Sequence, residues 1–129
     1  MREILFRGKR VGDNDWVYGY YYKAKLRTVD SELCDFITIP HPEEEGRRSD
    51  HYMVYSETVG QWTGLTDKNG IKIFEGDIFS HPTNTKYKYP VTWEDETASF
   101  GWFNDDGIGF DNSTIEVIGN IYDNPELLK

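Results

Sequence analysis

Short runs of apolar and polar residues with a two-residue period extend along most of the chain and predict β-strands. The clearest run is WVYGYYYKAK (16–25), where aromatic side chains recur at every second position. Further strands are expected at 4–6, 35–39, 52–65, 88–93, 98–103 and 113–122. Little helix is predicted, because only DNPELLK at the C-terminus offers a helical turn, with Asn124 as cap and Pro125 at the first helical position.

Glycine-rich turns separate the runs in TGLTDKNGIKIFEGDIF (63–79). Asn69-Gly70 predicts a type I′ hairpin turn between strands 62–65 and 71–74, because both residues tolerate a positive φ. Glu75-Gly76-Asp77 predicts a second tight turn. The stretch lacks the register of a calcium-binding loop and the phosphate-binding patterns GxGxxG and Walker A, so its glycines are expected to turn the chain.

The polar stretch EDET (94–97) predicts another hairpin turn, whereas PHPEEEGRRSD (40–50) predicts an exposed loop. Several short, closely spaced strands in residues 61–129 indicate a small barrel. We therefore expect a mainly β, single domain over 1–129. Residues 1–60 would supply additional N-terminal strands and a variable loop, and 61–129 the barrel-like part.

Composition favours a compact intracellular protein. Aromatic residues make up 16% of the 129 positions, which offsets a hydrophobic content of only 37%. The single cysteine, Cys34, excludes an internal disulfide and fits a reducing cytosol. The N-terminus resembles no signal peptide and no segment has the length of a membrane helix, so we expect no membrane association.

Charge is distributed unevenly along the chain, whose net charge is −9. Residues 1–27 carry seven basic and three acidic side chains, whereas residues 90–129 carry one basic and nine acidic side chains. The acidic total argues against general nucleic-acid binding, which depends on Lys and Arg. The segregation is compatible with head-to-tail self-association, although a well-solvated acidic surface is the simpler interpretation.

Five stretches, taken in order, resemble the YopX family of phage and prophage proteins: MREILFRGKR, WVYGYYY, VGQWTGLTDKNGIKIFEGDIF, VTWEDETASFGW and IEVIGNIYDNPELL. Residues 24–57 carry little of this pattern. The resemblance implies a mostly β fold with a barrel of the SH3-like type, in a protein encoded by a bacterial virus or an integrated prophage. It implies no particular activity and carries over no catalytic residue.

Metal ligands are concentrated in the loop HPEEEGRRSDH, which holds His41, Glu43, Glu44, Glu45, Asp50 and His51. Two histidines and a carboxylate are the ligand types of a catalytic zinc site. The spacing matches no metal-binding signature, and consecutive glutamates of a loop do not all point inward. We therefore expect a solvated loop without a metal ion.

Carboxylates also gather at the predicted turns, where Glu75 and Asp77 are expected near Glu94, Asp95 and Glu96. Paired carboxylates serve acid–base catalysis when burial separates their pKa values. The favoured role of Asp77 is structural, with its carboxylate accepting backbone N–H bonds in the tight turn. Cys34 is expected to be a buried, unreactive residue, and His81 lies before Pro82 in a predicted loop.

The candidate interaction surface is the aromatic strip of residues 16–22 with the basic residues beside it, and it comprises Trp16, Tyr18, Tyr20, Tyr21, Tyr22, Lys23 and Arg27. Aromatic rings beside basic groups are typical of proteins that bind single-stranded nucleic acid. The favoured interpretation places Trp16, Tyr18, Tyr20 and Tyr22 on the core face of a strand instead. Consecutive tyrosines must still put rings on both faces, which favours an additional covered surface or a homo-oligomer.

The favoured function is a non-enzymatic module that binds a host or phage protein, with no catalytic residue, cofactor or metal ion and with nucleic acid an improbable partner. Two alternatives remain. One is an acidic mimic of DNA that occupies a nucleic-acid-binding host protein, and it requires carboxylates in rows on one face. The other is a metal-dependent hydrolase that uses the 41–51 loop or the region of Asp77.

Overall fold

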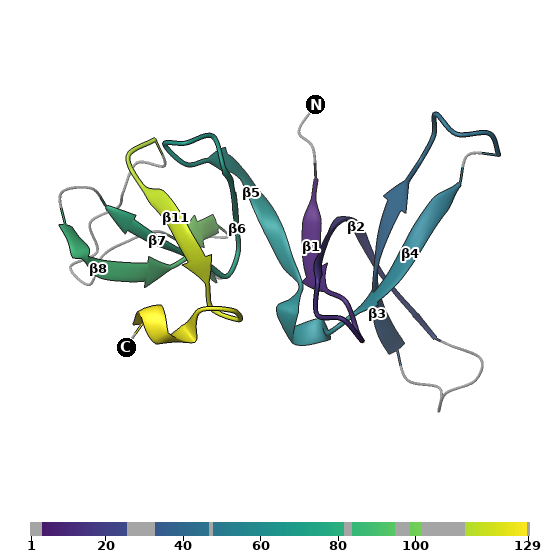
Figure 1. The fold of residues 1–129 in the computed structure, drawn as a ribbon, viewed down its shortest axis with the longest axis horizontal. Coiled ribbons are helices and arrows are strands. Elements are labelled where there is room, and N and C mark those ends of the chain that lie inside the picture. The colour runs from purple at the N-terminus through teal and green to yellow at the C-terminus, as the bar shows by residue number, and fades with distance from the viewer. Residues whose placement is uncertain are drawn as a thin grey trace. The chain divides into compact units, whose positions relative to one another are not determined.

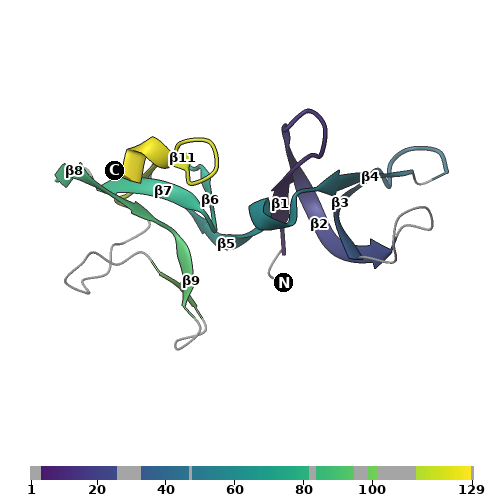
Figure 2. The ribbon, with the colours of Figure 1, turned by 90° about the horizontal axis from the view of Figure 1, so that it is seen from below.

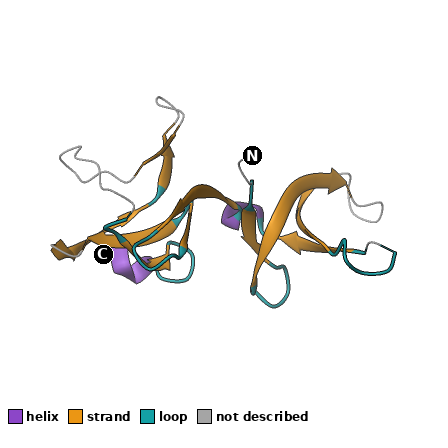
Figure 3. Cartoon of the chain, turned by 90° about the horizontal axis from the view of Figure 1, so that it is seen from above, coloured by secondary structure: helices purple, strands orange, loops and turns teal. Residues whose placement is uncertain are grey.

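The computed structural model describes residues 4–25, 33–46, 48–81, 84–94, 99–101 and 113–128. Two compact units follow one another, Met1–Gln61 and Trp62–Lys129 (Figure 1). Strands make up nearly all of the regular structure, and the only described helical segments are two short 3₁₀ turns (Figure 3). The predicted mainly β class with little helix is therefore confirmed. No described helix has the length and apolar character needed to cross a membrane.

The first unit contains a curved antiparallel sheet with the strand order β4-β3-β2-β1. Its elements are β1 (Phe6–Lys9), β2 (Trp16–Lys25), β3 (Leu33–Pro40), β4 (Ser49–Val54) and the 3₁₀ turn η1 (Ser56–Thr58). The start of β5 (Gly60–Thr66) pairs with β1. The clearest predicted strand, 16–25, has the same bounds as β2.

The core of this unit lies on one face of the sheet. Val17, Ile37 and Val54 come from β2, β3 and β4 and are buried together, and Phe6, Tyr21, Tyr52 and Val59 pack against them. The sheet curls enough for the end of β4 to reach the end of β1, where Val11 N–H donates to the Met53 carbonyl and Tyr55 N–H to the Lys9 carbonyl, both at 2.9 Å.

The second unit is built from β6 (Lys72–Phe74), β7 (Asp77–His81), β8 (Asn84–Pro90), β9 (Thr92–Glu94), β10 (Ser99–Gly101), β11 (Glu116–Asn120) and the 3₁₀ turn η2 (Pro125–Leu128). Strands β11, β7 and β8 form an antiparallel sheet in that order, and β9 pairs with β10 in the predicted hairpin. The chain bends away from the three-stranded sheet between β8 and β9 (Figure 2). Ile73, Phe79, Val91 and Ile115 form the buried core.

The strands of the second unit do not close into the barrel predicted for residues 61–129. Among the described residues, β5 pairs with β6, β9 with β10, and β7 with β8 and β11, and no ladder joins these groups into a ring. The prediction of a barrel was therefore wrong for the described residues, and an SH3-like type is not confirmed. Short strands with turn residues between them are common to barrels and open sheets, so their spacing alone does not distinguish the two.

The hairpin between β5 and β6 is confirmed, but its turn differs from the predicted type I′. Only Gly70 has a positive φ (+79°), and Gly70 N–H donates to the Asp67 carbonyl at 3.0 Å. The Asp67 carboxylate explains the difference, because it accepts N–H bonds from Asn69 and Ile71 and holds the turn in another conformation. Its second oxygen accepts from Val117 N–H in β11 at 2.9 Å.

Candidate interaction surface

Strand β2 presents three of its four tyrosines away from the core. Val17, Gly19 and Tyr21 face the core, whereas the exposed fractions of Tyr18, Tyr20 and Tyr22 are 46%, 56% and 36%. The favoured interpretation of the aromatic strip as the core face was therefore wrong. A two-residue period predicts that one face carries the tyrosines, but it does not say which face is covered.

Close packing between β2 and β3 explains why the smaller side chains face inward. A Cβ atom at Gly19 would stand 2.3 Å from the Thr38 carbonyl oxygen and 3.2 Å from Cγ2 of Ile37. No side chain fits at that position. Val17 and Ile37 fill the remaining core space with Val54, so the large rings of the neighbouring positions lie on the outer face.

The outer face carries a cluster of side chains from three strands. Tyr22 in β2 stacks on Phe36 in β3, with ring centroids 5.1 Å apart and planes inclined by 13°. The Tyr22 hydroxyl and the Thr38 hydroxyl each lie 3.0 Å from Nδ1 of His51 in β4, and both are hydrogen-bonded to this nitrogen. These contacts fix Tyr22 in a defined orientation although its ring is partly exposed.

Two cationic groups lie on Trp16 at the other end of the row. The Arg7 guanidinium is 4.6 Å and the Lys9 ammonium 5.6 Å from the centroid of the Trp16 ring, both within the range of cation–π contacts. The β1–β2 register pairs Arg7 with Tyr18 and Lys9 with Trp16, which places all four residues on one face. We call this outer surface, from Trp16 to His51, the tyrosine face.

The remaining residues of the predicted surface are not part of this face. Tyr21 lies on the core face, where its hydroxyl donates to Asp35 Oδ2 at 3.1 Å. Burial, followed by the hydrogen bond and the charge of Asp35, raises the pKa of Tyr21 to about 12. Lys23 pairs with the buried Asp35 in the register and so also faces away from the tyrosines. Arg27 lies outside the described residues.

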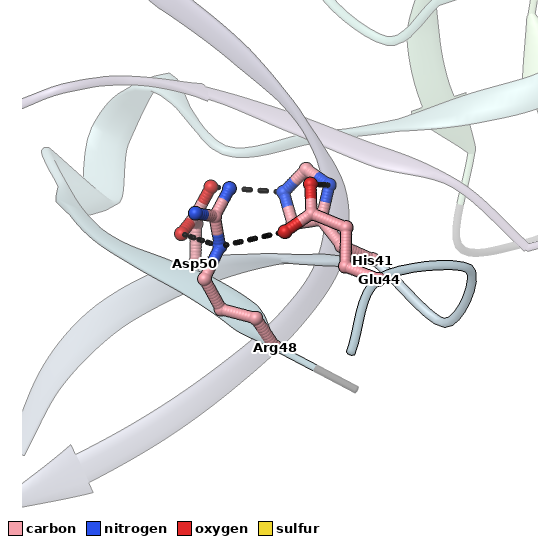
Figure 4. A network of polar contacts seen from close by, with 4 residues as sticks. All are labelled: His41, Glu44, Arg48 and Asp50. Atoms are coloured by element: carbon pink, nitrogen blue, oxygen red, sulfur yellow. Dashed lines mark hydrogen bonds and ion pairs between the residues drawn. The ribbon is translucent and has the colours of Figure 1, made fainter. Parts of the chain in front are cut away.

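The 41–51 loop forms the end of the β3–β4 hairpin and brings acidic, basic and imidazole groups together (Figure 4). His41 Nε2 lies 2.9 Å from Asp50 Oδ2, and His41 Nδ1 lies 3.8 Å from Glu44 Oε1. Nε of Arg48 is 3.5 Å from Glu44 and 3.4 Å from Asp50. The loop is exposed, as predicted.

His41, Glu43 and Glu44 could each offer one ligand atom to a metal ion, with these atoms within 4.8 Å of one another. The Arg48 guanidinium already pairs with Glu44, one of the two carboxylates of this group, and with the neighbouring Asp50. His51, the second histidine of the predicted ligand set, is hydrogen-bonded to Tyr22 and Thr38 on the tyrosine face. The arrangement is therefore that of an ion-pair network.

Asp77, one of the turn carboxylates, has a structural role. The Asp77 carboxylate is buried and accepts a hydrogen bond from Phe74 N–H at 2.7 Å, which confirms the predicted backbone contact. Gly76 precedes it with a φ of +91°. Asp95 and Glu96 lie outside the described residues, and nothing is described of the Glu94 side chain. The predicted catalytic grouping around Asp77 is not observed among the described residues.

Two other predicted positions differ slightly from expectation. Cys34 is half-buried in β3 rather than fully buried, and His81 is the last residue of β7 rather than part of a loop. Sequence reasoning did not identify Phe36 and Thr38 as neighbours of the tyrosines, and it assigned His51 to the metal loop. Once the pairing of Tyr22 with Phe36 is known, the two-residue alternation of side chains in β3 and β4 predicts which residues share the face of the tyrosines.

The YopX family model matches residues 5–129, almost the entire chain. The chain belongs to the YopX family. A comparison with curated proteins finds no match. Among solved structures, this YopX protein is similar to the crystal structure of protein EF1440 from Enterococcus faecalis, with 25% sequence identity, complete coverage of both chains and a TM-score of 0.58. The likeness extends over the whole length of both proteins.

Proposed function

We propose that this YopX protein is a phage- or prophage-encoded, non-enzymatic interaction module that binds a host or phage protein in the bacterial cytoplasm. The observation that carries the proposal is the exposed row of Tyr18, Tyr20 and Tyr22 on one face of β2. Tyrosine combines a large apolar ring with a hydrogen-bonding hydroxyl and is enriched at protein interfaces. The viral origin rests on the family, and the cytoplasmic setting on the single cysteine.

Pre-organisation supports a binding role for the face. Tyr22 is held by stacking on Phe36 and by the hydrogen bond to His51, so binding would cost little side-chain entropy at this position. Exposed aromatic rings on a sheet do not contribute to the core of the first unit, which is formed by Val17, Ile37 and Val54 on the opposite face. These exposed rings are therefore available for contacts with a partner protein.

Charge placement favours a protein partner over a nucleic acid. Single-strand binders place aromatic rings beside basic groups that follow the phosphates. In β2, Lys23 and Lys25 lie on the face opposite to Tyr18, Tyr20 and Tyr22. Of the two cations beside Trp16, Arg7 is buried, so Lys9 is the one partly exposed basic group on the tyrosine face within strands β1–β4. The net charge of −9 opposes phosphate binding further.

The test compares proteins captured from bacterial lysate by the wild type, by Tyr18→Ser/Tyr20→Ser and by Leu33→Ser. Leu33 is the matched control, because it is 57% exposed and lies at the end of β3 on the opposite face. We expect a protein that is recovered stoichiometrically after nuclease treatment, lost with the double variant and retained with Leu33→Ser. Equal recovery by all three proteins, or recovery of nucleic acid alone, would contradict the proposal.

A further inference from the structure

We propose that the partner contacts the tyrosine face with a short, extended and acidic segment of polypeptide. This inference rests on the proposed function and specifies the chemistry of the occupant. It follows from the size of the exposed row, from the charges on the two faces of the sheet, and from the spacing of the tyrosines.

The exposed row is small for an interface between two folded domains. If a tyrosine offers roughly 200 Å² of surface, the exposed fractions of Tyr18, Tyr20 and Tyr22 leave roughly 300 Å² of the three rings accessible. A standard protein–protein interface covers about 800 Å² on each partner. A segment of a few residues matches the available area better than a second copy of this chain does.

The charges of strands β1–β4 are divided between the two faces. Lys9 lies with Trp16 on the tyrosine face and is partly exposed, whereas Arg7, which also contacts the Trp16 ring, is buried with 6% of its surface exposed. The two carboxylates of these strands, Asp35 and Asp50, lie on the other face, because they pair with Val54 and Ile39 in the β3–β4 register. Within the described strands of this unit, the tyrosine face therefore offers one partly exposed cation, Lys9, and no carboxylate, whereas the opposite face carries Lys23 and Lys25 together with both carboxylates. A partner segment with Asp or Glu would be complementary near Trp16.

The spacing of the tyrosines matches an extended peptide. Alternate side chains of a strand are separated by about 6.6–6.8 Å, and the same repeat separates the side chains on one face of an extended partner. Apolar side chains of the segment would lie between the rings of Tyr18, Tyr20 and Tyr22. The hydrogen-bonded His51 and Thr38 mark the polar end of the row.

The experiment selects displayed random twelve-residue peptides on the wild type and removes those that also bind Tyr18→Ser/Tyr20→Ser. Enriched sequences are then synthesised, and their affinities are measured by titration calorimetry. We expect sequences that combine Asp or Glu with apolar residues. Tyr20→Ser should weaken their binding at least roughly tenfold, the loss typical of an interface hot spot. Lys9→Gln should weaken it roughly threefold and reduce its salt dependence.

Matched controls separate the face from the rest of the unit. Leu33→Ser and Lys25→Gln lie on the opposite face and should leave the affinity unchanged. The inference would be overturned by the absence of enriched peptides, by enriched peptides that are basic or uncharged, or by tighter binding of a single-stranded oligonucleotide. Self-association that depends on Tyr20 would also overturn it. The proposed function can survive two of these outcomes, self-association and the absence of enriched peptides. It would still be supported if a folded protein were captured in a way that depends on Tyr18 and Tyr20.

Discussion

The hydroxyl of Tyr22 lies 3.0 Å from Nδ1 of His51, although β3 separates the two strands that carry them. The contact crosses the outer face over Phe36 and Thr38, so three strands contribute to one surface. Tyr22 is thereby a positioned residue of an exposed face rather than a mobile side chain. The proposed interaction surface depends on this order.

Replacement of His51 should loosen this surface without unfolding the protein. His51→Ala removes an exposed ring and one hydrogen-bonding partner, so the free energy of unfolding should fall by only about 1 kcal/mol. The Tyr22 ring should become more mobile, which ring relaxation in aromatic ¹³C NMR would detect. Thr38→Val retains the imidazole and should affect Tyr22 less. Unchanged Tyr22 relaxation in His51→Ala would contradict the positioning role.

The Gly19 position should tolerate no side chain. Gly19→Ala places a methyl group 2.3 Å from the Thr38 carbonyl oxygen, a backbone atom that cannot move alone, so the free energy of unfolding should fall by about 2 kcal/mol or more. Tyr18→Ala, one residue away on the exposed face, should change it by less than about 0.5 kcal/mol. Urea denaturation measures both. Similar stability of the two variants would show that the faces of β2 are assigned wrongly.

Ionisation of Tyr21 should lower the free energy of unfolding at alkaline pH. Its pKa is raised from 10.0 to about 12 in the folded protein, so the neutral phenol is favoured by folding. The stabilisation is complete below pH 10 and is lost as the pH rises from 10 to 12, because the unfolded chain releases this proton first. Tyr21→Phe should therefore lose less stability over this interval than the wild type or Tyr20→Phe. Parallel pH profiles of Tyr21→Phe and the wild type would refute the assignment.

Removal of divalent metal ions should leave the protein unchanged. Arg48 lies within 3.5 Å of Glu44 and Asp50 and supplies the positive charge that a bound cation would otherwise provide. The melting temperature should be the same before and after dialysis against a chelator, because a lost ligand lowers stability only where it was bound. A lower melting temperature after chelation, restored by zinc and absent in His41→Ala, would revive the hydrolase hypothesis.

Strand β2 was predictable because the two-residue alternation of residues 16–25 is matched by alternating burial over its first five positions. The covered face of β2 was not predictable from that strand alone. It depends on Gly19 approaching Thr38 and on Val17 meeting Ile37 and Val54, which are contacts between residues distant in sequence. The tight turn before Asp77 was predicted correctly because its contact is local, whereas the Asp67 turn depends partly on Val117 in β11.

The candidate site was predicted only in part, because local sequence does not show contacts between residues distant in the chain. Local sequence identified Tyr18, Tyr20 and Tyr22 as neighbours, but their surroundings come from β1, β3 and β4 through the register. His51 illustrates the limit, since its sequence neighbours are the acidic residues of a loop and its spatial neighbours are Tyr22 and Thr38.

The most direct test of the account places a photo-crosslinking amino acid at position 20 in one variant and at position 33 in another, in bacterial cells. Tyr20 and Leu33 are equally exposed on opposite faces of the same sheet, at 56% and 57%. The account predicts a discrete crosslinked protein from position 20 and none from position 33. Crosslinks of equal yield from both positions, or crosslinks from position 20 to nucleic acid alone, would contradict a protein-binding tyrosine face.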